Sequence, residues 1–196
     1  MLHADTRAAI PAVLTGVESA AHQYGWDQPP IVFGMFGRVD LANSSSRGTI
    51  EVDPTLAAPD LWTTPDPTQP DESLPVPVVL QRLARELAAP GTQAWLQHWL
   101  RQDGRVCIGF GLSFEAWAAP MMPDYRRGDL AKAPAALRRE VRIVAAVDTD
   151  LGLHRVSRLN GDQTPTARSW PELPPWSRRR GIVLGLRALT ELAKRV

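Results

Sequence analysis

Residues 105–118 read Arg-Val-Cys-Ile-Gly-Phe-Gly-Leu-Ser-Phe-Glu-Ala-Trp-Ala, and this stretch decides the fold. Every even-numbered position from Val106 to Ala118 is apolar, whereas the odd-numbered positions are mostly small or polar. Because strand side chains alternate between two faces, this pattern predicts one long strand with a face in a core. The other face carries Gly109 and Gly111, which predict a cleft or the close approach of another backbone.

The residues that follow predict a hairpin and a helix. Residues 140–147 and 153–159 are typical of strands, and Asp148-Thr149-Asp150-Leu151-Gly152 between them is typical of a hairpin turn. Residues 160–176 predict a loop rich in Pro and Trp. Ser177 is a candidate N-cap for the final helix. The inward face of that helix is predicted to hold Ile182, Val183, Leu186, Leu189 and Ala193.

The residues that precede the long strand predict further helices and strands. They are an amphipathic helix over 7–24, strands over 31–36 and 47–53, and two helices, over 76–87 and after Thr92. Because helices and strands do not alternate regularly, an antiparallel α+β fold is favoured over a doubly wound one. We expect a sheet of about five strands, covered by N-terminal, central and C-terminal helices.

The segment 54–77 differs in composition from the rest. It is rich in Pro and Asp, and proline disfavours both helices and strand ladders, so an extended loop or a disordered linker is predicted. Trp62 is its predicted apolar anchor. A chain of 196 residues fits one domain, so residues 1–196 are interpreted as a single α+β domain with this loop inside it.

The formal net charge of +1 hides a strong asymmetry. Residues 1–76 hold ten acidic and three basic side chains, and residues 77–196 hold eleven acidic and nineteen basic ones. The asymmetry indicates either that the two parts face each other or that one of them meets a charged partner. Cys107 is the single cysteine, and no apolar run is long enough to span a bilayer, so a cytoplasmic protein is expected.

Two segments are candidate binding sites for a partner or an anion. The loop over 119–135 offers methionine, tyrosine and arginine, which are enriched at protein interfaces. The predicted start of the last helix places three arginines where the helix dipole favours acids, which suggests an anion site, a solvated turn or pairing with the acidic segment. The candidate residues are Met121, Met122, Tyr125, Arg126, Arg127, Arg178, Arg179 and Arg180.

Catalytic, metal and nucleotide motifs are not evident in the sequence. Asp148 and Asp150 fall short of a calcium loop, the four histidines form no ligand pair, and Gly-x-Gly at 109–111 does not open a helix. No metal or cofactor is therefore expected. The enzyme hypothesis that stays open is a pocket in which Glu115 acts with an arginine from 138–142.

Two stretches resemble a group of small, uncharacterised actinobacterial cytoplasmic proteins. The first is Tyr24-Gly25-Trp26-Asp27-Gln28-Pro29-Pro30 before an apolar strand, and the second is the strand pair over 140–159 before a C-terminal helix. The resemblance implies a fold and a compartment, and no activity. From the residues, we expect a non-enzymatic protein-binding or adaptor protein, with a nucleic-acid-associated protein and an enzyme as the alternatives.

Overall fold

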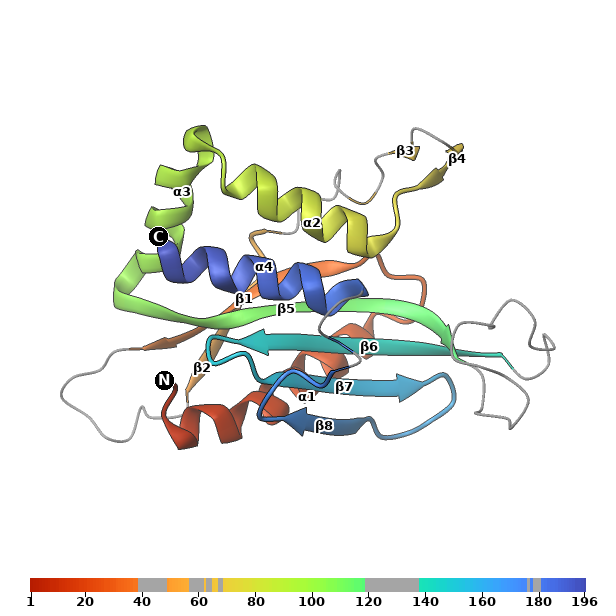
Figure 1. Ribbon diagram of the computed structural model, residues 1–196. Coiled ribbons are helices and arrows are strands. Elements are labelled where there is room, and N and C mark those ends of the chain that lie inside the picture. Colours follow the sequence, from red (N-terminus) through yellow and green to blue (C-terminus); the bar gives the residue numbers. More distant parts are fainter. Residues whose placement is uncertain are drawn as a thin grey trace.

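The computed structural model describes residues 1–38, 49–56, 62, 65–66, 69–118, 138–175, 177 and 181–196. Its centre is an antiparallel six-stranded sheet with the order β2-β1-β5-β6-β7-β8 (Figure 1). The predicted α+β class is therefore confirmed, with six strands where about five were expected. The strands are β1 (Ile31–Arg38), β2 (Ile50–Asp53), β5 (Arg105–Ala118), β6 (Arg139–Asp148), β7 (Leu153–Leu159) and β8 (Thr166–Trp170).

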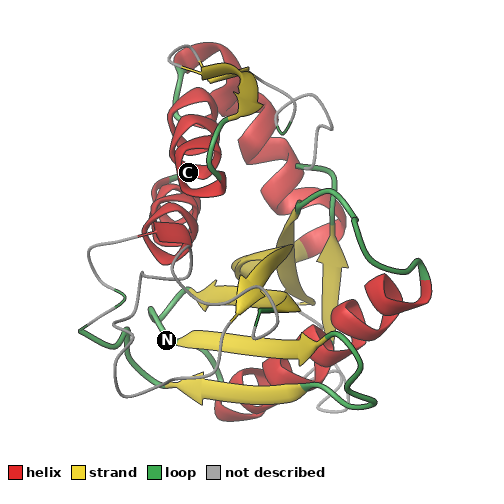
Figure 2. Cartoon of the chain, turned by 90° about the vertical axis from the view of Figure 1, so that its right-hand side faces the viewer, coloured by secondary structure: helices red, strands yellow, loops and turns green. Residues whose placement is uncertain are grey.

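Helices cover both faces of this sheet, which makes three layers (Figure 2). One face is covered by α1 (Ala4–Gln23). The other face is covered by α2 (Val76–Leu87), α3 (Pro90–Arg101) and α4 (Gly181–Arg195), and a short 3₁₀ turn, η3 (Gln102–Gly104), leads from α3 into β5. The buried apolar residues accordingly form two clusters, one on each side of the sheet.

The long strand β5 has the predicted bounds, but its central residues are buried on both faces. Its register with β1 shifts between Met35 and Phe36, so that Ile108 is left without a partner on β1. Ile108 packs in the cluster under α1, whereas Phe110 belongs to the cluster under the other three helices. The extra residue at this bulge interrupts the alternation of faces along β5. Apolar residues that belong to one alternating series in the sequence therefore pack in two different cores.

The glycines of β5 make the close contacts that were predicted. A Cβ atom on Gly111 would lie 2.3 Å from ring atoms of Phe33, and one on Gly109 would lie 2.4 Å from the carbonyl oxygen of Val147. Any larger side chain at these positions would separate β5 from its neighbours.

Helix α1 begins before the predicted start. The ring of His3 accepts a hydrogen bond from the backbone N–H of Asp5, 3.3 Å away, and so caps the helix. Pro11 consequently lies inside the helix, beyond its first turn. The face toward the sheet buries Ile10, Leu14 and the charged Glu18 completely.

Two other segments differ from the predictions. Residues 166–170, predicted as a loop, form β8, an edge strand that pairs with β7. Within 54–77, Leu56 and Trp62 are buried in the main core, and β3 (Pro65–Asp66) and β4 (Gln69–Ser73) make a small two-stranded sheet. None of the described helices is both long and apolar enough to cross a bilayer.

Candidate functional site

The eight residues predicted to bind a partner or an anion all lie outside the described residues. They belong to the segments 119–137 and 178–180, of which the structure gives no description. The site is therefore built from the charged side chains and cavities of the rest of the chain.

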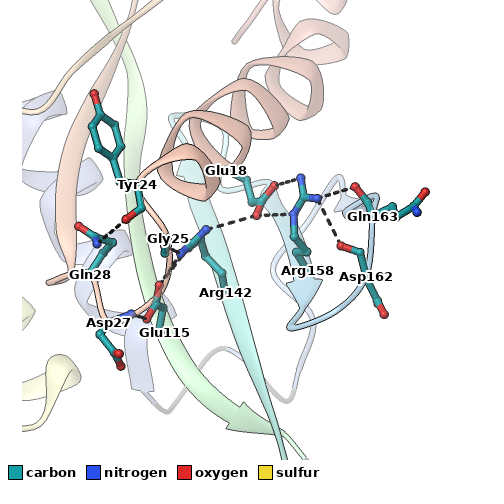
Figure 3. A network of polar contacts seen from close by, with 10 residues as sticks. All are labelled: Glu18, Tyr24, Gly25, Asp27, Gln28, Glu115, Arg142, Arg158, Asp162 and Gln163. Atoms are coloured by element: carbon teal, nitrogen blue, oxygen red, sulfur yellow. Dashed lines mark hydrogen bonds and ion pairs between the residues drawn. The ribbon is translucent and has the colours of Figure 1, made fainter.

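A buried ion-pair network joins α1 to the sheet (Figure 3). The guanidinium of Arg158 on β7 donates from Nε and Nη2 to the two carboxylate oxygens of Glu18, at 2.8 and 2.7 Å. Glu18 is fully buried and Arg158 is 5% exposed. The hydrogen bonds to Glu18 raise the pKa of Arg158 further above its normal high value, although burial opposes the shift. Arg158 therefore carries its positive charge at neutral pH.

The expected pairing of Glu115 with an arginine from 138–142 is present. Glu115 and Arg142 are direct partners in the β5–β6 register, and Glu115 Oε1 accepts from Arg142 Nη2 at 2.6 Å and Nε at 3.1 Å. Glu115 Oε2 accepts from the backbone N–H of Asp27 at 2.7 Å, and Arg142 Nη2 also donates to the carbonyl of Gly25. This network holds the chain that follows α1 against β5 and β6. The centre of the Trp26 ring lies 4.7 Å from the guanidinium carbon of Arg142.

The contacts of Glu115 fit a structural role better than the role of a general base. Both of its carboxylate oxygens accept hydrogen bonds, and the charges of Glu18, Glu115, Arg142 and Arg158 balance. The adjacent cavity holds only about 50 Å³ and is lined in part by Ser113 and Arg142. A space of that size admits about one or two waters.

A second network ties β2 to β5 and α3 on the opposite face of the sheet. Arg105 donates from Nη1 to Asp53 Oδ2 at 2.8 Å and from Nε to the carbonyl of Trp99 at 3.0 Å. Trp99 Nε1 also donates to Asp53 Oδ2, at 2.9 Å. Burial raises the pKa of Asp53, but hydrogen bonds from Thr55 and Arg105, together with the Arg105 charge, hold it below its usual value. Glu18 and Asp53 show that part of the acidic half neutralises arginines of the basic half within the fold.

A groove of about 410 Å³ runs between α2 and α4. The two helices touch where a Cβ atom on Gly185 would lie 2.5 Å from Leu80 Cβ, and beyond this contact they leave an open channel. Ala84, Ala88, Ala188 and Leu192 supply apolar lining, and Gln81, Arg85, Glu191 and Arg195 supply the polar part.

The arginines in and beside this groove differ in whether they form an ion pair with a carboxylate. Glu191, which lines the groove, is bound by Arg187 at 2.8 Å, and on α2, outside the lining, Arg82 is bound by Glu86 at 2.7 Å. Arg85 and Arg195 are exposed, and neither forms an ion pair with a carboxylate of the described residues. The groove thus combines an apolar lining with two arginines that form no ion pair among the described residues.

Metal ligands do not gather in the described part of the chain, where no three His, Cys, Asp or Glu side chains lie close enough to hold an ion. Asp148 and Asp150 are instead occupied by backbone N–H groups and by Arg7. Cys107 is a poor nucleophile because burial raises the pKa of its thiol to about 12.

Comparisons with protein-family models, with curated proteins and with solved structures find no match to this chain. The resemblance to actinobacterial proteins therefore stays a prediction, and any function must be argued from the geometry alone.

Proposed function

We propose that the protein is an adaptor that binds an acidic amphipathic helix of a partner protein in the groove between α2 and α4, without chemistry at that groove. The observation that carries this proposal is the combination of an alanine-lined channel with Arg85 and Arg195, which no described carboxylate neutralises. Grooves between helices commonly receive the apolar face of an amphipathic helix.

Charge complementarity selects an acidic occupant. A helix with Glu or Asp beside its apolar stripe would place carboxylates opposite Arg85 and Arg195, and charge-assisted hydrogen bonds of arginine to carboxylate are strong and directional. The small side chains Ala84, Ala88 and Ala188 allow close approach of a helix carrying larger apolar residues. This surface is separate from the arginine-rich one predicted from the sequence, whose residues lie outside the described part of the chain.

The nucleic-acid alternative receives less support from the described arginines. Arg142 and Arg158 are buried in ion pairs, and Arg139 is bound to Asp162 at 2.9 Å. They are therefore poor candidates for phosphate contacts, although binding of single-stranded nucleic acid would still appear as a steep dependence on salt. The cytoplasm is proposed as the compartment, in keeping with a single, unreactive Cys107.

The test is a binding titration with a designed probe. A fluorescent amphipathic helix of about 20 residues, with Leu on one face and Glu on the other, should bind in the micromolar range. The double variant Arg85→Glu/Arg195→Glu should weaken binding at least about tenfold, a loss of roughly 1.4 kcal/mol. The control Arg168→Glu changes an exposed arginine on β8, away from the groove, and should bind as the wild type does. Equal binding by all three proteins, or preference for single-stranded DNA, would contradict the proposal.

A further inference from the structure

A further polar cluster lies near the N-terminal end of α1, where β6 turns into β7. The imidazole of His154, 2% exposed, lies between two oxygen groups. Its Nδ1 is 2.9 Å from the hydroxyl of Ser169, and its Nε2 is 3.0 Å from Asp148 Oδ2. The three residues come from β6, β7 and β8, and His154 and Ser169 are direct partners in the sheet register.

The carboxylate of Asp148 is buried and held from several sides. Its Oδ1 accepts from the backbone N–H groups of Asp150 and Gly152, each at 2.8 Å, and Arg7 Nε lies 3.4 Å from Oδ2. A Cβ atom at position 152 would lie 2.5 Å from Oδ2, so only glycine leaves room for this carboxylate.

This environment determines which nitrogen of His154 carries the proton. An ionised carboxylate accepts hydrogen bonds only, so Nε2 must donate to Asp148. In the neutral ring, Nδ1 is then an acceptor, and the hydrogen bond to Ser169 must come from the serine hydroxyl. The ring faces the serine with Nδ1 and the carboxylate with Nε2, the reverse of the arrangement in chymotrypsin.

Ser169 is exposed on the edge strand β8, whereas its two partners are buried. A serine hydroxyl, a base within hydrogen-bond distance and a carboxylate that orients the base are the nucleophile, base and orienting group of a catalytic triad. We infer that Ser169 is a nucleophile activated by His154 and oriented through Asp148, and that the protein hydrolyses small, activated acyl esters at this site. This activity is separate from the binding role of the groove and does not depend on it.

The reaction needs no further reactant than water. Ser169 Oγ attacks the ester carbonyl while His154 Nδ1 takes the hydroxyl proton. The tetrahedral intermediate collapses with release of the alcohol, which receives that proton from His154. Water, deprotonated by His154, then attacks the acyl-serine; as the bond to Ser169 Oγ breaks and the carboxylic acid leaves, His154 returns the proton to Ser169 Oγ. Ser169 lies on the sheet edge and lines neither the groove nor the small cavity described above. Neither cavity can therefore hold a large substrate at this serine, so the proposed substrates are small esters with good leaving groups.

The first test measures hydrolysis of p-nitrophenyl acetate at about pH 7.5 by the full chain. Ser169→Ala removes the hydroxyl that His154 activates. The rate should therefore fall at least about 100-fold, the lower end of the range for general-base catalysis. Ser157→Ala removes a hydroxyl from the neighbouring strand β7 and should leave the rate unchanged. The inference is overturned if the wild type and Ser169→Ala hydrolyse the ester equally fast.

The second test does not depend on ester turnover. In Ser169→Cys, the imidazole should stabilise a thiolate, so that the midpoint of iodoacetamide alkylation falls below the ordinary cysteine value of about 8.5. Cys107 contributes little background, because burial raises its pKa to about 12. A midpoint at or above the ordinary value would show that His154 does not activate position 169.

Discussion

Glu18 and Arg158 lie 140 positions apart in the chain and form a two-point ion pair in the interior, at 2.7 and 2.8 Å. The pair connects α1 to β7 and joins the acidic first part of the sequence to the basic second part. Arg142 Nη1 lies 3.9 Å from the same carboxylate, so one buried acid is shared by two arginines.

Removal of Glu18 should destabilise the protein strongly. Glu18→Ala leaves Arg158 buried without a counter-charge, and breaking a buried pair in this way typically costs about 3–5 kcal/mol. The double variant Glu18→Leu/Arg158→Met removes both charges and should recover much of the loss. Urea unfolding monitored by tryptophan fluorescence measures both; a double variant no more stable than the single one would argue against this interpretation.

The same substitution in two helices should have opposite effects on stability. A Cβ atom on Gly16 of α1 would meet nothing within 4 Å, so Gly16→Ala should stabilise by about 0.5–1 kcal/mol through helix propensity. Gly185→Ala should destabilise by about 1–3 kcal/mol, because the new methyl group overlaps Leu80 Cβ and forces α4 from α2. Thermal unfolding of both variants provides the comparison, and a stabilising Gly185→Ala would contradict the close contact.

Arg105 should not tolerate replacement by lysine. Its guanidinium bonds Asp53 and the carbonyl of Trp99 while stacking 3.8 Å from the centre of the Phe36 ring, and an ammonium group cannot make all three contacts. We expect Arg105→Lys to cost about 1–3 kcal/mol. Arg82→Lys, at an exposed i,i+4 pair with Glu86, should change stability by less than about 0.5 kcal/mol and serves as the control in chemical denaturation. Equal losses in the two variants would contradict the special role of the guanidinium.

Acid should weaken the fold partly through Asp148. Burial raises its pKa, but hydrogen bonds from His154 and the Gly152 N–H, with the charge of His154 once its ring is protonated and the charge of Arg7, hold it below the usual value. The folded state therefore binds the proton less readily than the unfolded chain. The stabilisation by ionised Asp148 is fully present above the pKa that this carboxyl has in the unfolded chain. It is lost as the pH falls through the pKa that the carboxyl has in the folded protein.

Asp148→Asn isolates this contribution. The wild type should be more stable than the variant at neutral pH, and the difference should shrink as pH falls below about 4, the ordinary range of an aspartate. Urea unfolding between about pH 2.5 and 7 measures it. A difference that stays constant over this range would mean that the Asp148 charge contributes nothing.

The central strands and the helices can be predicted from the sequence because their apolar residues recur with a clear strand or helix period. The bulge at Ile108 is hidden, since the even positions of β5 stay apolar on both sides of it. The strand β8 is missed because Thr166–Trp170 is mostly exposed and lacks an apolar period, and its pairing with β7 depends on tertiary contacts. Edge strands of this kind carry little local signal.

The sites were harder to predict than the fold. Strand position alone predicts that Glu115 meets an arginine from 138–142. Glu18 shares a helical face with Ile10 and Leu14, a spacing that marks it as buried, but an acid on such a face is usually taken to be solvated. Ser169, His154 and Asp148 meet only because a strand without a sequence signal pairs beside the hairpin.

The most direct test of the proposed binding role is a charge-swap titration at the groove. Wild-type protein should prefer the Glu-faced amphipathic peptide over the same peptide with Lys in place of Glu. Arg85→Glu/Arg195→Glu should reverse this preference, because each peptide then meets the opposite charge across the same apolar lining. If both proteins bind the two peptides with the same order of affinity, the groove between α2 and α4 is not the docking site.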